Sequence, residues 1–197
     1  MLTLAFDTAT SFASVALVQD GKLLGESSSR AVAVLDDVDD LFHDARCAKT
    51  ELNALVVGTG PGSFTGMRLG LATARALAFA LEVPVAGVSS LHALAAGFPG
   101  AVPVIDAGRR EIFTLRADAP VCLKPEDLEL APGTVCVGDG ALRYRDVLEA
   151  KGAEIPIDAV APHTPRARFH VQLAHDFGPA EEIEPLYLRV PDAEQKA

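Results

Sequence analysis

The chain has 197 residues, 49% of them hydrophobic, and a formal net charge of −10. This length and apolar content can form one large domain or two small lobes of about 100 residues, each with a core of its own. The acidic balance argues against independent nucleic-acid binding, because such binding needs clustered Lys and Arg to neutralise phosphates.

Cysteine usage and hydropathy indicate a cytoplasmic protein without a membrane span. Cys47, Cys122 and Cys136 lie far apart and form neither a CxxC pair nor an even-numbered disulfide framework. The first residues, MLTLAFDTAT, lack the basic region of a signal peptide. The longest apolar stretch, 67–81, is shorter than the roughly 20 residues of a membrane span and contains two arginines.

The first third of the chain predicts strands followed by a helix. LTLAFDT (2–8) and SVALVQDGKLLGESS (14–28) have the pattern of two or three strands, with Asp20-Gly21 as a tight hairpin turn. Residues 35–45 predict an amphipathic helix, because apolar residues recur on one face and aspartates lie elsewhere. The apolar face comprises Leu35, Val38, Leu41, Phe42 and Ala45.

The next segment alternates strands with helices. ALVVG (54–58) predicts a buried strand, and a glycine-rich turn separates it from a long helix that ends near Leu81. PVAGV (84–88) predicts another strand, and Ser89 is a good N-cap for the helix SSLHALAAG. This alternation implies an α/β sheet.

The second half repeats the opening pattern. AVPVIDAGRREIFTLRA (101–117) has a strand ending at Asp106, an Ala-Gly turn and a second strand, as the chain does around Asp7. The repeat indicates a duplicated lobe, or alternatively the ordinary hairpins of any α/β protein. TVCVGDGA (134–141) predicts a strand that ends in a glycine turn, and a helix is expected near 167–177. EPLYLRVPDAEQKA predicts a short strand and, from about residue 191, a mobile tail.

The glycine-rich segment GTGPGS differs from the common phosphate-binding loops. It lacks the lysine of a Walker A loop and does not fit G-x-G-x-x-G. Gly60 and Gly62 can nevertheless adopt positive φ, and Ser63 and Thr65 lie near a helix N-terminus, where free N–H groups can receive an anion. The alternative is a tight strand-to-helix turn shaped by Pro61.

The long helix carries a ridge of small residues at every fourth position: Gly66, Gly70, Ala74 and Ala78. Each interior glycine costs about 1 kcal/mol of helix stability relative to alanine, so close packing must offset this loss. The helix is apolar nearly all round and must be covered on more than one side, by the fold or by a second protein. We expect the small ridge to be a surface on which another protein packs.

Candidate catalytic groups are few. Asp7 and Asp106 follow strand ends, where carboxylates could position magnesium or water beside a phosphate, or could simply form turns. The five histidines contain no H-x-x-x-H or H-E-x-x-H pair, so no metal site is expected. The aspartates at 36–44 lack an EF-hand loop, and the residues around Ser63 do not form G-x-S-x-G.

Five segments occur in the order found in one protein family: LAFDTAT, GTGPGSFTGMRLGLATARALA, VPVIDAGRREIF, VGDGA and EPLYLR. Together they resemble the TsaB (YeaZ) family of bacterial tRNA threonylcarbamoyladenosine synthesis, the non-catalytic paralogues of TsaD. The resemblance touches nearly the whole chain, and GPGSFTG is its most specific part. It implies a two-lobed, actin-like (ASKHA) α/β fold with duplicated lobes of mixed sheets flanked by helices. We expect a lobe at residues 1–100 that carries the interface helices, and a smaller lobe at 101–197.

The resemblance also implies a role without catalysis and without a cofactor. Family members pair with the catalytic subunit TsaD and act with the ATPase TsaE in threonylcarbamoyl transfer to adenosine 37 of ANN-decoding tRNAs. A homodimer is expected in isolation, and contact with tRNA only through the complex. Arg30, Ala31, Asp36 and Thr59 depart from the residues usual in the family and leave the composition of the interface helix open.

Two sets of residues follow from the resemblance. The vestigial nucleotide loop comprises Asp7, Thr8, Thr10, Gly60, Gly62, Ser63, Thr65 and Asp106. The partner interface comprises Val34, Leu35, Val38, Met67, Arg68, Leu71, Ala72, Arg75 and Phe79, with Arg75 as a central anchor. The alternative is a small actin-fold phosphotransferase or nucleotide hydrolase that uses Asp7 and Asp106 around magnesium. A zinc peptidase is a third alternative.

Overall fold

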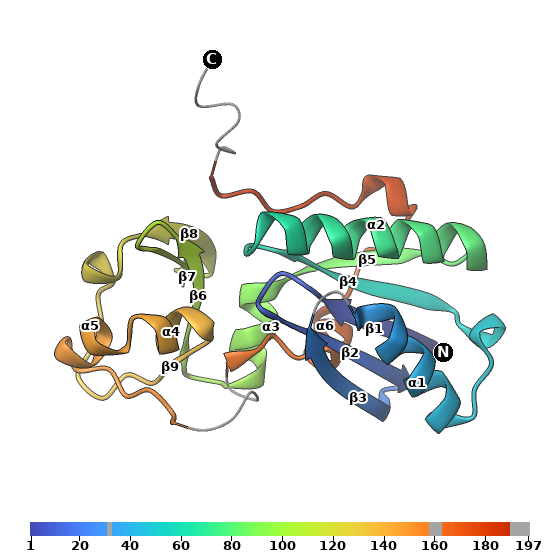
Figure 1. Ribbon diagram of the computed structural model, residues 1–197, viewed down its shortest axis with the longest axis horizontal. Helices are drawn as coiled ribbons and strands as arrows, with labels where there is room; N and C mark the ends of the chain where they lie inside the picture. Colours follow the sequence, from blue (N-terminus) through green and yellow to red (C-terminus); the bar gives the residue numbers. More distant parts are fainter. Residues whose placement is uncertain (31–32, 158–162, 190–197) are drawn as a thin grey trace, which may run out of the picture.

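Two β-sheets organise the chain into two lobes in the computed structural model, which describes residues 1–30, 33–157 and 163–189 (Figure 1). The first sheet has the order β3-β2-β1-β4-β5, and the second has the order β8-β7-β6-β9. The strands of the first sheet are β1 (Leu2–Asp7), β2 (Phe12–Gln19), β3 (Lys22–Arg30), β4 (Ala54–Gly60) and β5 (Val85–Ser89). Those of the second are β6 (Val102–Gly108), β7 (Glu111–Arg116), β8 (Ala119–Leu123) and β9 (Cys136–Val137).

The second sheet repeats the topology of the first. β1 pairs antiparallel with β2 and parallel with β4, just as β6 pairs antiparallel with β7 and parallel with β9. β3 and β8 then complete the two antiparallel hairpins. Both sheets are mixed, so the expected duplication of a mixed α/β lobe is confirmed.

Helices cover both faces of the first sheet. The helices of the two lobes together are α1 (Val34–Ala45), α2 (Phe64–Leu81), α3 (Ser90–Gly97), α4 (Asp139–Arg143), α5 (Arg145–Ala150) and α6 (Ala167–Leu173). Of these, α4 and α5 pack in the second lobe. Short 3₁₀ helices are η2 (Lys49–Glu51), η3 (Pro125–Asp127) and η5 (Ala180–Glu182). Side chains alternate along β1, so Leu4 and Phe6 join a core with α1 and α2, whereas Ala5 faces α6. No helix of the described residues is long and apolar enough to cross a membrane.

The interlobe helix α3 belongs to the core of the second lobe. Leu91 and Leu94 pack with Ile105, Phe113 and Val137 of the second sheet. α3 also contacts α6 and the ends of β4 and β5, so it lies between the two sheets (Figure 1). The helix α3 therefore contacts elements of both lobes.

Several expectations about local structure hold. The hairpin turn at Asp20 and Gly21 has positive φ at both residues, 50° and 79°, as a type I′ turn requires. The long helix ends at Leu81 as expected. Ser89 occupies the expected N-cap of α3, although its hydroxyl makes no capping bond. Both the turn and the helix limits are set by residues close in sequence.

Other expectations are wrong in detail. The strand expected to end at Asp106 continues to Gly108, and the turn consists of Arg109 and Arg110, both with positive φ. The helix expected over 167–177 ends at Leu173. Residues 184–189 form an irregular segment instead of a strand. The tail expected from residue 191 lies outside the described residues.

The C-terminal part of the chain returns to the first lobe. α6 contacts β1, β2 and β4, and Gly178 pairs with Val85 at the edge of β5. A boundary at residue 100 remains a prediction, but residues 167–183 pack on the first sheet and not on the second. Buried and partly buried polar contacts hold α6 on the first sheet, and each of them joins residues that lie far apart in the sequence.

Candidate functional site

A cleft of about 690 Å³ lies between the lobes, where the vestigial nucleotide loop was expected. Four of the eight expected loop residues line it: Thr10, Gly62, Ser63 and Asp106. The others do not line it. Asp7, Thr8 and Gly60 are buried, and Thr65 is exposed on the first turn of α2.

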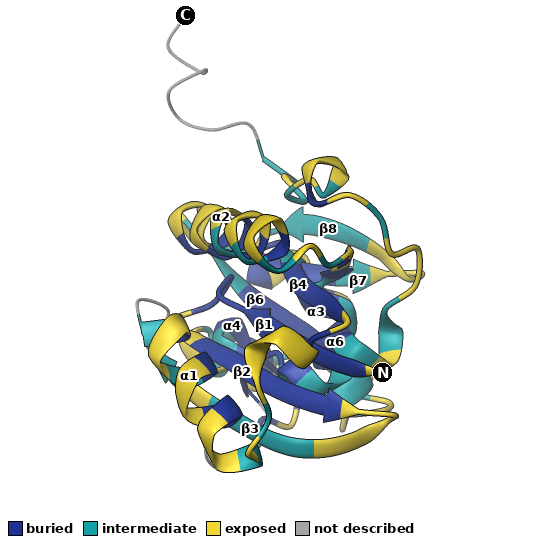
Figure 2. Cartoon of the chain, turned by 90° about the vertical axis from the view of Figure 1, so that its right-hand side faces the viewer, coloured by how far each residue is buried: buried dark blue, intermediate teal, exposed yellow. Residues whose placement is uncertain are grey.

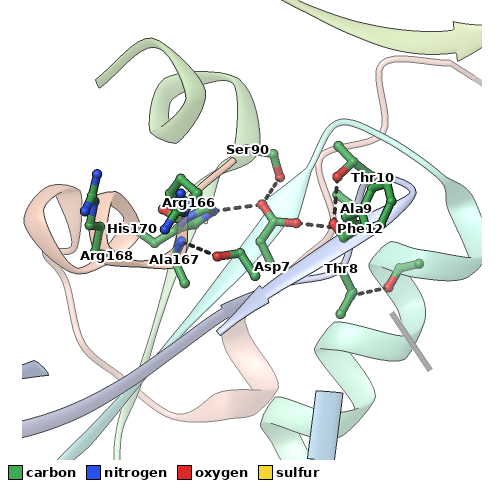
Figure 3. A network of polar contacts seen from close by, with 12 residues as sticks. Asp7, Thr8, Ala9, Thr10, Phe12, Ser90, Arg166, Ala167, Arg168 and His170 are labelled. Atoms are coloured by element: carbon green, nitrogen blue, oxygen red, sulfur yellow. Dashed lines mark hydrogen bonds and ion pairs between the residues drawn. The ribbon is translucent and has the colours of Figure 1, made fainter. Parts of the chain in front are cut away.

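Asp7 is enclosed in a network of internal hydrogen bonds and is only 2% exposed (Figure 3). One carboxylate oxygen, Oδ1, accepts the N–H of Ala9 at 2.7 Å. The other, Oδ2, accepts the hydroxyl of Ser90 and lies 2.8 Å from Nε2 of His170, whose side chain is completely buried. With these partners in place, the carboxylate cannot reach a ligand in the cleft.

The ring of His170 links the Asp7 carboxylate to the start of α6. His170 places Nε2 against the Asp7 carboxylate and Nδ1 3.2 Å from the carbonyl oxygen of Arg166, so both ring nitrogens face acceptors. Burial alone raises the pKa of Asp7, but the hydrogen bond and charge of His170, with the bonds from Ser90 and Ala9, hold this pKa below its ordinary value of 3.8.

Two further contacts fix α6 on the sheet beside this network. Ser14 of β2 accepts the N–H of Ala167 at 3.0 Å, and Glu26 of β3 accepts the N–H of Arg168 at 3.2 Å. Glu26 also forms an ion pair with Arg166. The first turn of α6 is therefore capped by side chains from neighbouring strands, and β1, β2 and β3 all make polar contacts with the helix.

The glycine-rich loop packs directly on the loop that follows β1. The N–H of Ser63 donates to the carbonyl of Ala9 at 2.7 Å, so this donor is not free for a phosphate. Gly62 does not have positive φ. Its role is spatial, because a Cβ there would lie 2.2 Å from the Ala9 carbonyl oxygen. Gly60 has the expected positive φ of 90°. These contacts support the tight-turn interpretation of the segment.

The small-residue ridge of α2 packs inside the chain. Gly66, Gly70, Ala74 and Ala78 are all buried, and a Cβ on Gly66 would lie 2.1 Å from the carbonyl oxygen of Thr8. Thr8 also donates its hydroxyl to the carbonyl of Gly66 at 2.7 Å. The expectation that another protein packs on this ridge is therefore wrong, because the first lobe itself covers the ridge.

The carboxylates of the second lobe also have internal partners. Asp106 accepts the N–H of Gly108 at 3.0 Å and the hydroxyl of Tyr144 at 3.2 Å, and it pairs with Arg143 at 2.8 Å. Asp139 accepts the amide of Asp106 at 3.0 Å. Burial raises the pKa of Asp139 to about 6. The hydrogen bond from the Asp106 amide opposes this rise, and the Asp106 carboxylate adds to it. Among the described residues, no cluster of three or more His, Cys, Asp or Glu could hold a metal.

Four of the expected interface residues belong to the core of the first lobe. Val34, Val38, Met67 and Leu71 are buried and contact neighbours within this chain. Leu35, expected on the inner face of its helix, is 51% exposed instead. It comes one residue after the buried Val34, at the start of α1, and points outward.

The outer face of α2 is exposed in the single chain (Figure 2). Four exposed apolar residues on it are spaced three to four apart, so they form one stripe along the helix, beside the exposed Arg68 and Arg75. They are Leu69, Ala72, Ala76 and Phe79, and Phe79 is 86% exposed. Ala72 and Phe79 belong to the interface set expected from the sequence, whereas Leu69 and Ala76 do not. Because α2 is apolar nearly all round, its periodicity alone did not reveal which side faces the sheet.

Arg68 and Arg75 hold a segment of this chain. Arg75 donates to the carbonyls of Ala180 and Ile183, at 3.3 and 2.8 Å. Arg68 donates to the Tyr187 hydroxyl at 3.1 Å, and its guanidinium lies over the ring of Phe64, 3.8 Å from the centroid. Arg75 as a free central anchor is therefore not supported. No local sequence signal indicated partners more than 100 residues away.

Comparisons with known proteins agree with this geometry. The family model for TsaD, tRNA N6-adenosine threonylcarbamoyltransferase, matches residues 27–151. The tRNA threonylcarbamoyladenosine biosynthesis protein TsaB of Escherichia coli is 31% identical, over 96% of this chain and 95% of the relative. The structure of YeaZ from Pseudomonas aeruginosa superposes with a TM-score of 0.74 at 29% identity, over 95% of this chain and 99% of that one.

A more distant likeness concerns the fold alone. Component A of (R)-2-hydroxyglutaryl-CoA dehydratase from Acidaminococcus fermentans superposes with a TM-score of 0.55 at 12% identity, over 88% of this chain and 97% of that one. The two-lobed actin-like fold is thus confirmed. Together with the match over nearly the full chain, this places the protein: it belongs to the TsaB (YeaZ) family, paralogous to TsaD.

Proposed function

We propose that this protein is a non-catalytic partner subunit in the biosynthesis of tRNA threonylcarbamoyladenosine. In this role it pairs with a TsaD-like catalytic subunit, acts with a TsaE-like ATPase in the cytoplasm, and reaches adenosine 37 of ANN-decoding tRNAs only through the complex. It forms a homodimer when the catalytic subunit is absent. Membership of the TsaB family supports the pathway.

The uncovered apolar face of α2 carries this proposal. A stripe of exposed apolar residues with an aromatic side chain at one end is typical of a helix that packs against another protein. The proposed contact residues are accordingly Leu35, Leu69, Ala72, Ala76 and Phe79. Arg68 and Arg75 contribute through the segment that they hold, since their side chains are engaged within the chain.

The phosphotransferase alternative lacks support from the site. Both carboxylates that it requires have internal partners, and the N–H of Ser63 is taken by the carbonyl of Ala9. A nucleotide in the cleft would have to displace these bonds. The zinc peptidase alternative likewise finds no ligand cluster among the described residues.

Phe79→Glu tests the assignment of the surface. Placing a charge at Phe79 removes the aromatic anchor of this apolar stripe, which is worth about 2 kcal/mol or more, or at least about a 30-fold loss of affinity. Sedimentation velocity of the isolated chain, and of the chain mixed with the catalytic subunit, should show both associations weakened. Thermal stability should not change, because Phe79 makes little contact within the chain.

Ile157→Glu is the matched control. Ile157 is also a large apolar residue, is 92% exposed, and follows the second-lobe segment that Arg145 of α5 holds. Its substitution should leave both associations intact. Wild-type sedimentation of the Phe79 variant, alone and in the mixture, would reject the outer face of α2 as the partner surface.

A further inference from the structure

The C-terminal segment 180–189, which we call the strap, touches both lobes. Its first part lies along α2, where Arg75 donates to the carbonyls of Ala180 and Ile183. Further along, the N–H of Leu186 donates to the carbonyl of Thr59 at the end of β4, at 2.9 Å. These contacts attach the strap to the first lobe at several points.

The end of the strap is attached to the second lobe by a different set of contacts. Arg189 donates to the carbonyl of Ala107 at 3.1 Å and forms an ion pair with Glu111. Leu188 packs against the apolar core formed by α3 and the second sheet. Figure 1 shows the strap running over α2 toward the second lobe. The strap is therefore a non-covalent connection between lobes, additional to the chain crossings before β6 and before α6.

The strap also forms part of the wall of the interlobe cleft. Residues 186–189 line the cleft together with Ala9 and Thr10 of the first lobe and Phe113 of the second. Tyr187 stacks near Phe64, with ring centroids 5.5 Å apart, at the N-terminal end of α2. Any movement of the lobes that widens the cleft must stretch or release the strap, since its two ends are attached on opposite sides.

We propose that the strap holds the cleft closed and couples its width to the partner-binding helix α2. The attachment to the second lobe is the weaker one, because it depends on one partly exposed ion pair, one hydrogen bond and one partly buried leucine. Release of Arg189 opens the cleft and leaves the first-lobe end of the strap in place.

The coupling follows from the position of Arg68 and Arg75. Both side chains arise from α2 and both hold the strap. The strap is either attached to the second lobe through Arg189 or released from it. A partner that binds the outer face of α2 more tightly in one of these two states shifts the strap toward that state. The state of the strap then changes the affinity for the partner by the same factor. This coupling, unlike the closing of the cleft, rests on the proposed function.

Hydrogen exchange of the isolated chain tests the closing of the cleft. In Arg189→Ala, amides of residues 184–189 and of the cleft-lining segments 62–64 and 106–108 should exchange at least several-fold faster than in the wild type. Amides of β1 and β4 should be unchanged. Glu111→Gln removes the ion pair from the other side and should have the same effect. This second variant keeps the test valid if the first folds poorly.

Arg143→Ala is the control, because Arg143 is an exposed arginine of the second lobe whose ion partner, Asp106, lies in the same lobe. It should not accelerate exchange in the strap. Wild-type exchange at the cleft in both the Arg189 and Glu111 variants would overturn the proposal. Titration of the Arg189 variant with the catalytic subunit then tests the coupling separately. An altered affinity supports it, and an unaltered affinity with an open cleft rejects the coupling alone.

Discussion

Asp7→Asn separates a structural role of this residue from a catalytic one. Asparagine keeps the size of the side chain and an oxygen that can accept the N–H of Ala9, but it removes the negative charge beside His170. Both side chains of this contact are buried, with exposures of 0% for His170 and 2% for Asp7. Leaving one partner of such a pair alone costs about 3–5 kcal/mol. This is a large fraction of a typical total stability of about 5–15 kcal/mol.

Urea unfolding of the variant at neutral pH measures this cost. Asp106→Asn is the control: its ion pair with Arg143 is partly exposed to solvent, with side-chain exposures of 61% for Arg143 and 20% for Asp106, and should contribute at most about 1 kcal/mol. The pKa of Asp7 is lowered in the folded protein, so its stabilising contribution is complete above the ordinary value of 3.8 and is lost as the pH falls through the folded pKa. The difference in the free energy of unfolding between the wild type and Asp7→Asn should therefore shrink at pH values below 3.8.

Two results would refute this reasoning. The first is a loss of less than about 1 kcal/mol in Asp7→Asn, which would mean that the network with His170 and Ser90 does not hold α6. The second is micromolar binding of Mg-ATP to the wild type that disappears in a stably folded variant. That outcome would return Asp7 to the role of a phosphate or metal ligand and favour the enzyme alternative.

Two further outcomes are expected from substitutions beside the cleft. Asp139→Asn should stabilise the protein at pH 8, by at most about 3 kcal/mol and by less where solvent screens the charge. The pKa of Asp139 is raised to about 6, so the stability that depends on its neutral form is present below the ordinary value of 3.8 and lost as the pH rises through 6. Urea unfolding at pH 8 and at pH 3.5 should therefore show the gain at pH 8 only, and an equal gain at both pH values would contradict this assignment. Gly66→Ala should lower the free energy of unfolding by about 1–3 kcal/mol, and with it the melting temperature, despite alanine's higher helix propensity. The reason is that the added Cβ would lie 2.1 Å from the Thr8 carbonyl oxygen. Calorimetry checks this, with the exposed Ala72→Gly as a comparison for propensity alone, and a stabilised Gly66→Ala would show that α2 does not press against the loop after β1.

Local sequence determined the secondary structure and the duplication of the lobes. Two-residue periodicity marks β1 and β2, the pair Asp20-Gly21 sets a turn with two positive φ angles, and the apolar run after Ser63 sets the limits of α2. The order strand, turn, strand around Asp7 recurs around Asp106, and the two sheets repeat one topology. These features depend on residues close together in the chain, so a sequence pattern suffices to predict them.

The tertiary structure alone decided which side of α2 is covered and what its charged neighbours do. A helix that is apolar all round has no periodicity that points to the sheet, and only the fit of Gly66 against Thr8 turns the small ridge inward and leaves Phe79 outside. Asp7 and His170 are 163 residues apart, and Arg75 and Ile183 are 108 apart. Such contacts depend on the order of the strands and on the return of the C-terminal segment to the first sheet. No local pattern encodes that order, because a buried charge is satisfied by whichever partner the whole fold brings to it.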